Sequence, residues 1–404
     1  MKFVEGGVCA AKGFRAAGLH CGIRKSQTKK DIALVVSDAK ASAAAVYTLN
    51  LVKSAGITVT KRHLSDGYAR AVICNSGIAN TCVSDGEANA LKMCELTAQA
   101  VGIDPADVVC ASTGVIGVSL DMNPIAAALP QLADRLSENG HTDAAEAIMT
   151  TDTVRKEFAV EFELDGRLCH IGGMAKGSGM IHPNLGTMLV FITSDVAITP
   201  RMLENAVRSD VADTFNAVSI DGDTSTNDMV CLLANGIAGN TVIDCENADF
   251  DVFKAALHKL TDKLCTEIAK DGEGATKLIV CSVTGAVTKQ DAKTIAKSVV
   301  CSSLVKTALF GADANWGRVL CAIGYAGASV DVTKVQVEFT SSAGSIKVCE
   351  NGMGIPFSED LAKTILTEDE ITVRVTLADG DGAAVAKGCD LTYDYVKING
   401  DYRT

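Results

Sequence analysis

KGSGMIHPNLGTMLVFITSD, the stretch from Lys176 to Asp195, joins a glycine-containing loop to an apolar strand. The run MLVFIT, Met188 to Thr193, is too continuously apolar for a surface loop and short enough for a buried strand. Thr187 stands at the junction, directly after Gly186. We therefore expect a layered protein whose core contains this strand, with a threonine hydroxyl where the strand begins.

This threonine is a candidate nucleophile. A threonine hydroxyl reacts poorly at neutral pH without a base beside it, and one known arrangement takes the base from the free α-amino group of the same threonine. That arrangement requires cleavage of the Gly186–Thr187 bond. The new amine would titrate near ~8, close enough to neutral pH to take and return a proton. On local pattern alone, the alternative is an ordinary Gly-Thr step that enters a core strand.

Composition and charge limit the classes of function. The chain has 404 residues, of which 48% are hydrophobic and 36 are glycine, so it forms one large or two ordinary globular domains. Its 37 Lys and Arg against 49 Asp and Glu give a net charge of −12. This charge opposes nucleic acid or an anionic membrane as a partner and favours a small substrate. No run approaches the ~20 apolar residues of a membrane span, and the N-terminus lacks a signal-peptide core. We expect a cytoplasmic protein.

Neither the cysteines nor the acidic strip predicts a metal. The 15 cysteines are scattered, contain no CxxC pair and mostly lie in apolar runs, where cysteine behaves as a small buried hydrophobe. The strip DGDTSTND, Asp221 to Asp228, superficially resembles a calcium loop. An EF-hand needs glycine at the sixth position and glutamate at the twelfth, which here hold Thr226 and Leu232. We expect a structural turn network near the site, with no metal.

Strand and helix patterns alternate without a Pro- or Ser-rich linker, and no internal repeat is apparent. Apolar β-rich runs lie at residues 32–36, 69–74, 188–193, 277–283, 335–340 and 371–377. Helices are predicted at about residues 251–270, stopping at Gly272, at 86–101, and from near Lys289. The mixture predicts a layered α/β or α+β architecture rather than a pure doubly wound sheet.

Several motifs occur in the order of one known family. The autoprocessing segment of that family reads KGSGMI-x-PN-x-[AG]-TML, which 176–189 matches. The other matching segments are 75–80 (NSGIAN), 111–117 (ASTGVIG), 150–153 (TTDT), 221–228 (DGDTSTND), 271–276 (DGEGAT), 315–318 (NWGR) and 399–404 (NGDYRT). The chain resembles the ornithine acetyltransferase family, also called the glutamate N-acetyltransferase family. Two residues depart from its usual pattern: Ile78 replaces an asparagine, and Gly186 stands where alanine is commoner.

This resemblance implies a fold of facing β-sheets with flanking helices and a function in arginine biosynthesis. It implies transfer of acetyl from N-acetylornithine to glutamate, with release of ornithine, through an ester on Thr187 after self-cleavage at Gly186–Thr187. Residues 1–186 would form one chain and 187–404 a second, both parts of one folded unit and present in two copies each. No cofactor is implied, although some members also load glutamate from acetyl-CoA.

The resemblance also assigns site residues. Thr113, through its side chain, and Gly114, through its backbone N–H, would stabilise the oxyanion. Lys176 would bind the substrate carboxylate and Glu273 would supply an acidic contact, which suits an amino acid that carries both charges. The remaining substrate-binding positions are Thr150, Thr187, Asn399 and Thr404. A phosphate-binding loop fits the Lys176 region poorly, because the GxxxxGK[ST] spacing is absent.

Two other functions stay open from the sequence. An N-terminal-nucleophile amidohydrolase or aminopeptidase would use the same self-cleaving chemistry, with water instead of glutamate as the acyl acceptor. A non-catalytic amino-acid-binding protein would keep the Gly186–Thr187 bond intact. The two are distinguished by an acetyl-transfer assay with and without glutamate, and by the intact mass of the purified protein.

Overall fold

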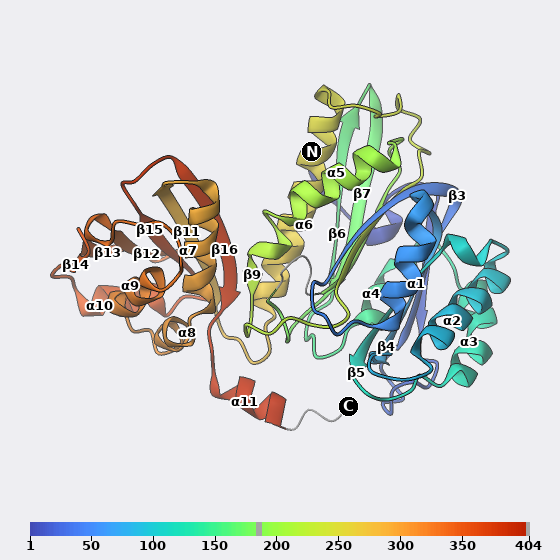
Figure 1. Cartoon of the computed structure of the whole chain (residues 1–404), viewed down its shortest axis with the longest axis horizontal. Helices are drawn as coiled ribbons and strands as arrows, with labels where there is room; N and C mark the ends of the chain where they lie inside the picture. Colours follow the sequence, from blue (N-terminus) through green and yellow to red (C-terminus); the bar gives the residue numbers. More distant parts are fainter. Residues whose placement is uncertain (183–187, 401–404) are drawn as a thin grey trace.

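The computed structural model describes residues 1–182 and 188–400, which form a body and a smaller C-terminal lobe (Figure 1). Three predicted site residues, Gly186, Thr187 and Thr404, lie outside the described residues. The described part contains a nine-stranded and a seven-stranded sheet with helices packed on both. The predicted mixed α/β class is therefore confirmed.

The body contains the nine-stranded sheet. Its order is β1-β6-β7-β8-β10-β3-β4-β5, with β2 paired to β3 beside this path. The strands are β1 (Lys2–Val4), β2 (Phe14–Leu19), β3 (Ile32–Tyr47), β4 (Tyr68–Ile78), β5 (Val108–Val115), β6 (Lys156–Leu164), β7 (Arg167–Lys176), β8 (Leu189–Ser194) and β10 (Met229–Ala234). The helices are α1 (Ala55–His63), α2 (Gly86–Val101), α3 (Met122–Asp134), α4 (His141–Ile148), α5 (Pro200–Val211) and α6 (Ala248–Lys270).

The long strand β3 folds this sheet into two facing halves. Its first part pairs with β2 and β4, its last part pairs with β10, and the register on β4 shifts between Val36 and Ala41. Because side chains alternate along a strand, each half has an inner and an outer face. The inner faces share one core, to which Val72 of β4 and Phe191 of β8 both belong. The expected facing sheets are thus present as two halves of one continuous sheet.

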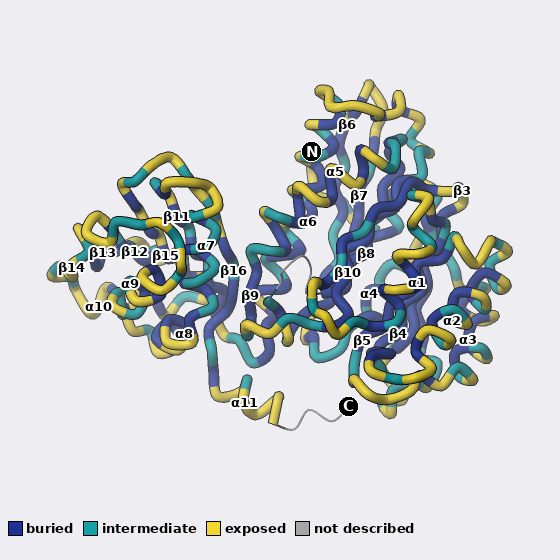
Figure 2. The backbone as a smooth tube through the Cα atoms, in the orientation of Figure 1, coloured by how far each residue is buried: buried dark blue, intermediate teal, exposed yellow. Residues whose placement is uncertain are grey.

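Helices cover both outer faces of the folded sheet. One outer core joins β2–β5 to α1, α2 and α3, and another joins β6, β7, β8 and β10 to α5 and α6 (Figure 1). On β8, Leu189 and Phe191 enter the inner core while Val190 and Ile192 enter the outer core. Both faces of β8 are therefore buried (Figure 2), which is why its sequence is apolar without alternation.

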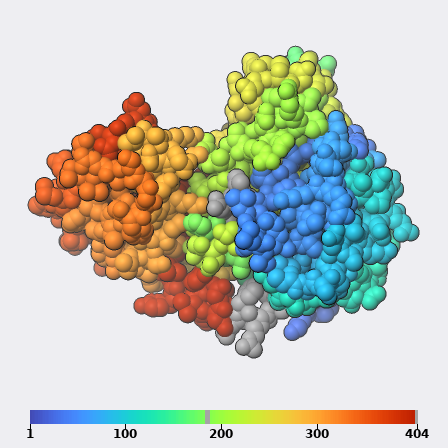
Figure 3. Space-filling view, in the orientation of Figure 1, coloured from blue at the N-terminus to red at the C-terminus, as the bar shows by residue number. Residues whose placement is uncertain are grey.

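The C-terminal lobe contains the seven-stranded sheet, in the order β14-β13-β12-β15-β11-β16-β9 (Figure 3, orange to red). Its strands are β9 (Val218–Ser219), β11 (Leu278–Ala286), β12 (Gln336–Ser341), β13 (Gly344–Glu350), β14 (Met353–Gly354), β15 (Glu370–Thr376) and β16 (Gly382–Cys389). The helices that follow the body are α7 (Lys289–Cys301), α8 (Ser303–Phe310), α9 (Trp316–Gly324), α10 (Glu359–Leu366) and α11 (Tyr393–Gly400). Within the described residues, no helix is long and apolar enough to cross a membrane.

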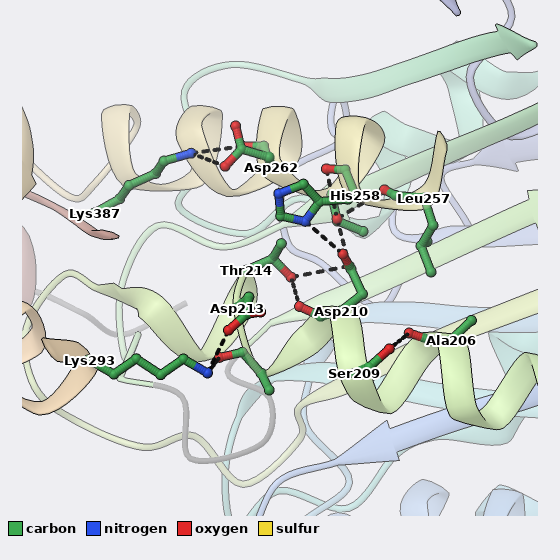
Figure 4. Close-up of polar contacts among 12 residues, drawn as sticks. Ala206, Ser209, Asp210, Asp213, Thr214, Leu257, His258, Asp262, Lys293 and Lys387 are labelled. Atoms are coloured by element: carbon green, nitrogen blue, oxygen red, sulfur yellow. Dashed lines mark hydrogen bonds and ion pairs between the residues drawn. The ribbon is translucent and has the colours of Figure 1, made fainter. Parts of the chain in front are cut away.

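Polar contacts join the lobe to the body (Figure 4). Helix α6 packs against β6 and β7 of the body and against β16 of the lobe. Lys387 of β16 bonds Asp262 of α6 at 2.5 Å, and Lys293 of α7 bonds Asp213, just beyond α5, at 2.5 Å. β9 comes from the chain before α6 yet pairs in parallel with β16, so backbone hydrogen bonds also cross between the two parts.

The predicted elements occur in the structure with shifted ends. The six predicted strands correspond to β3, β4, β8, β11, β12 and β15, and the three predicted helices to α2, α6 and α7. The prediction for β3 stopped at Val36, whereas the strand continues to Tyr47 through a bend and an alanine-rich segment of low β propensity. Helix α6 begins three residues earlier than predicted, where the Asn247 side chain caps the Phe250 N–H, and its C-cap is Asp271 rather than Gly272.

Candidate active site

A cavity of about 560 Å³ lies where β5, β7, the loop after α6 and helix α11 meet. Every predicted site residue that the structure describes lines it: Thr113, Gly114, Thr150, Lys176, Glu273 and Asn399. The other lining residues are Lys25, Val115, Ile116, Thr151, Gly179, Met180, Ser225, Thr226 and Asn227. Residues separated by most of the chain's length therefore share one pocket, while their individual roles remain predictions.

The Thr113–Gly114 pair is held rigidly at the end of β5. It lies beside β4 in parallel register, with Gly77 opposite Gly114. The backbone at Gly114 has φ +131°, and a Cβ atom there would come within 2.2 Å of the Gly77 carbonyl carbon. Only glycine fits this position, so the backbone of the pair is fixed before a ligand arrives. Fixed donors are what stabilisation of a developing oxyanion requires.

Lys176 ends β7 with its side chain largely buried in the cavity wall. No described residue accepts a hydrogen bond or an ion pair from its ammonium group, although its charge acts on the buried carboxyls of Asp152 and Asp228 from a longer distance. A buried charge without a partner is costly, and an anionic ligand would relieve that cost. The geometry therefore suits a carboxylate-bearing ligand at Lys176.

A buried ionic network fixes the loop that follows Lys176. The Lys156 ammonium bonds Asp152 at 2.7 Å and Asp271 at 2.5 Å, and the Gly177 N–H donates to Asp152 at 2.7 Å. Burial alone would raise the pKa of Asp152, but the charges of Lys156 and Lys176 outweigh it and lower that pKa to about 2. Asp152 therefore stays ionised near neutral pH. Asp152 lies in the TTDT motif and Asp271 in the DGEGAT motif, but neither aspartate was predicted to have a role.

Glu273 and Asn399 meet in the cavity wall. The Asn399 side-chain amide donates to the Glu273 carboxylate at 2.7 Å. Gly179 makes room for this carboxylate, because a Cβ at that position would lie 2.4 Å from the Glu273 Cδ. Thr392, just before α11, donates to the Gly274 carbonyl at 2.6 Å, which anchors the helix to the same loop. α11 accordingly leaves the lobe and crosses toward the body (Figure 1).

The acidic strip 221–228, which was expected to form a turn network near the site, contributes residues 225–227 to the cavity wall. Asn227 donates to the carbonyls of Ala79 at 2.7 Å and Ser112 at 2.6 Å, which ties the strip to β5 and to the NSGIAN motif. Asp221 accepts the backbone N–H groups of Met180 at 2.5 Å and Ile181 at 2.9 Å, as the expected turn network requires. Within the described part of the chain, no three His, Cys, Asp or Glu side chains are grouped to hold a metal ion.

Asp228 and Ile78 lie close to residues that line the cavity, and the structure shows what surrounds each of them. Burial raises the pKa of the Asp228 carboxyl well above its usual range, and its Oδ2 atom has no hydrogen-bond partner among the described residues. Ile78, which departs from the family pattern, ends β4 half-buried against the outer core under α1–α3. An apolar side chain packs well at that position.

The body consists of two facing half-sheets with helices on both outer faces. Its cavity, lined by Lys176 and Glu273, suits an enzyme that binds a small charged substrate. The family model described as the ArgJ family matches residues 15–404. The chain belongs to the ArgJ family, which confirms the family resemblance of its motifs. It is 48% identical to the arginine biosynthesis bifunctional protein ArgJ of Bacillus subtilis, covering 99% of this chain and 97% of that protein.

Further known proteins are similar to this chain. ArgJ 1 of Clostridium acetobutylicum is 47% identical over 97% of this chain and 96% of its own length. A solved ArgJ structure from Bacillus halodurans is 45% identical with a TM-score of 0.50, covering 52% of this chain and 98% of that chain. An ornithine acetyltransferase of Mycobacterium tuberculosis, solved in complex with ornithine, is 36% identical with a TM-score of 0.42, covering 46% of this chain and 98% of that chain.

Proposed function

We propose that this protein transfers the acetyl group of N-acetylornithine to glutamate in arginine biosynthesis, through an acetyl ester of Thr187. The observation that carries the proposal is the convergence of six motif residues on one cavity that holds an unpaired, buried ammonium group and a carboxylate. An amino acid with a carboxylate and a distal ammonium group is complementary to both charges. The bifunctional arginine-biosynthesis proteins that it resembles at 47–48% identity support the same assignment.

The proposed reaction has two acyl-transfer steps. The Thr187 hydroxyl attacks the acetyl carbonyl, the carbon–nitrogen bond breaks, and ornithine leaves with the proton that the Thr187 amine carries. Glutamate then attacks the ester through its amino group, and the carbon–oxygen bond breaks to give N-acetylglutamate. Thr113 and the Gly114 N–H stabilise both tetrahedral oxyanions. Lys176 holds the substrate carboxylate and Glu273 the distal ammonium group.

Self-cleavage would divide the chain into residues 1–186 and 187–404. β8 pairs with β7 of the first part and with β10 of the second, so both parts belong to one hydrogen-bonded sheet and stay together after cleavage. The solved Bacillus halodurans chain covers only about half of this one although nearly all of it matches, which supports a chain end near the middle. We propose two copies of each part in the assembled enzyme.

The proposed location is the cytoplasm. All fifteen cysteines are free, and most are buried, which suits a reducing compartment. No cofactor is part of the proposed reaction, and acetyl-CoA is proposed as a second acetyl donor.

Exchange kinetics test this function. Purified protein with N-acetylornithine and glutamate should give parallel double-reciprocal lines, because acetyl leaves the first substrate before the second binds. Thr187→Ala should abolish both cleavage and transfer, whereas Thr187→Ser keeps a hydroxyl and an amine and should retain measurable cleavage. Equal acetyl release with and without glutamate would indicate an amidohydrolase instead. Efficient cleavage of Thr187→Ala would disprove the proposed chemistry.

A further inference from the structure

The two proposed substrates of the cavity differ in charge. N-acetylornithine carries one carboxylate and one ammonium group, whereas glutamate carries two carboxylates once its amino group is neutral for attack. Lys176 and Glu273 in the cavity wall are complementary to the charges of N-acetylornithine. The Glu273 carboxylate would repel the side-chain carboxylate of glutamate. A cavity that serves both substrates in turn therefore needs another cation.

Lys25 is a second cation of this cavity. Among the described residues that line it, the ionisable side chains are those of Lys25, Lys176 and Glu273. No described carboxylate lies within ion-pair distance of the Lys25 ammonium group. The cavity thus offers one cation and one anion to a ligand with one charge of each sign, and two cations to a ligand with two carboxylates.

The backbone before Lys25 is fixed beside the Thr113–Gly114 end of β5. The buried carboxylate of Asp31 accepts the backbone N–H of Arg24 at 3.0 Å. The Arg24 side chain packs against Gly77, where a Cβ atom would lie 3.0 Å from the Arg24 Cγ. Gly77 is in turn the strand partner of Gly114. Lys25 therefore follows directly on a segment that is anchored next to the cavity.

The other cations of the segment 24–30 are placed differently. The Arg24 guanidinium group donates to the Met149 carbonyl. The Lys30 ammonium group bonds two carboxylates, at 2.5 and 2.6 Å. Lys29 is exposed and lines the adjoining cavity instead. Lys25 is thus the cation that this segment contributes to the cavity of the motif residues.

From this arrangement we infer that Lys25 selects glutamate as the acyl acceptor by binding its side-chain carboxylate. The inference rests on the proposed function, because it explains how one cavity accepts two substrates of different charge. Lys176 binds the α-carboxylate that both substrates share, and Glu273 binds the distal ammonium group of N-acetylornithine. A lysine suits the added contact, because its ammonium group is a compact charge on a flexible stem.

Kinetics of the two half-reactions test this role. Because the acetyl group is transferred in two separate steps, the kcat/KM of each substrate reports its own step. For Lys25→Met we expect the kcat/KM for glutamate to fall about tenfold, the cost of one hydrogen bond to a charged group. The kcat/KM for N-acetylornithine should stay within about twofold, which also shows that the variant folds.

Two further variants control for charge and for position. Lys25→Arg keeps the charge and should recover most of the kcat/KM for glutamate. Lys29→Met removes a charge from the same segment outside this cavity, and it should change neither kcat/KM. Added salt should lower the kcat/KM for glutamate more steeply in the unmodified enzyme than in Lys25→Met, because one ionic contact is screened only in the former.

Three results would overturn the inference: an unchanged kcat/KM for glutamate in Lys25→Met, an equal fall for both substrates, or an equal fall for glutamate in Lys29→Met. Equal salt dependence of the unmodified enzyme and Lys25→Met would also contradict it. An unmodified enzyme that fails to exchange acetyl between N-acetylornithine and glutamate would instead contradict the proposed function.

Discussion

The cavity and the contact between body and lobe both contain polar side chains from distant segments, but the charges are paired at the lobe contact and partly unpaired in the cavity. At the lobe contact each cation faces a carboxylate at the surface, as Lys387 faces Asp262 and Lys293 faces Asp213 (Figure 4). In the cavity wall Lys176 is buried without a described partner, and the nearby Asp228 is buried with one oxygen unbonded. The cavity therefore keeps polar groups that a ligand can bind, whereas the polar groups at the lobe contact hold the lobe and the body together.

The largest loss of stability is expected at Lys156. This lysine lies beside the cavity, but its charge is fully paired, as at the lobe contact. Lys156→Met would leave Asp152 and Asp271 as buried carboxylates without their shared cation. We expect a loss of about 3–5 kcal/mol in the free energy of unfolding, measured by urea denaturation. Lys293→Met, at the half-exposed lobe contact, is the matched control and should cost less than about 1 kcal/mol. Equal losses would remove the distinction between the two regions.

The same network predicts an acid transition. The folded pKa of Asp152 is about 2, below the unfolded value of about 3.9. Its contribution to stability is therefore complete above pH ~4 and is lost as pH falls toward the folded value. Asp152→Asn should flatten this part of the curve of unfolding free energy against pH. An unchanged curve would show that Asp152 is not held ionised by its lysines.

Substitution of Thr113 tests whether the cavity is catalytic. Thr113→Ala should lower kcat for acetyl exchange by about 10²–10³-fold, the cost of one oxyanion donor. Thr113→Ser, which keeps the hydroxyl, should recover most of the activity. The melting temperature should stay close to that of the unmodified protein, because the structure gives the Thr113 side chain no role in the core clusters. Loss of stability in proportion to activity would make Thr113 structural.

Lys176 should separate binding from stability. Lys176→Met would remove the cation that faces the carboxylate of the ligand, so we expect the KM for N-acetylornithine to rise about 10- to 100-fold. The free energy of unfolding should fall much less than in Lys156→Met, since Lys176 forms no hydrogen bond or ion pair with a described residue, although its charge helps to keep Asp152 ionised. Steady-state kinetics and urea denaturation of one preparation measure both. A stability loss like that of Lys156→Met would mean that Lys176 has a structural partner.

The smallest effect is expected at His258, near the lobe contact. The hydrogen bond to Asp210, at 2.9 Å, raises the pKa of His258 despite partial burial. A raised folded pKa adds stability that is present below the unfolded value of ~6.5 and disappears as pH rises through the folded value. His258→Gln should thus lose less than about 1 kcal/mol at pH 6, because the side chain is half-exposed, and nothing at pH 9. Equal loss at both pH values would refute an ionic contribution.

The sequence predicted those features that depend on local pattern. Helix α2 and the buried strand β8 followed from periodicity and apolar runs. The folding of the sheet at β3 did not, because one strand serves both halves through a bend that no turn motif marks. The separate seven-stranded sheet was also missed, since β9 enters it from far earlier in the chain.

Some residues of the candidate site could likewise be predicted from local motifs, and others could not. Lys176 and Glu273 were assigned because their motifs resemble those of the family, and both residues line the cavity. Lys156 was not found, because its importance comes from burial and from a contact with Asp271 across 115 positions of sequence. The raised pKa of Asp228 likewise results from its burial and is not indicated by its motif. Tertiary burial decides these cases, and a single sequence does not display it.

The central claim is that Thr187 becomes a chain end and carries the acetyl group. The most direct measurement is the intact mass of the purified protein, before and after brief exposure to N-acetylornithine without glutamate. The account predicts two chains, corresponding to residues 1–186 and 187–404, with the second gaining the mass of one acetyl group that glutamate then removes. A single active species at the full 42.0 kDa, or an acetyl group on the first chain, would contradict it.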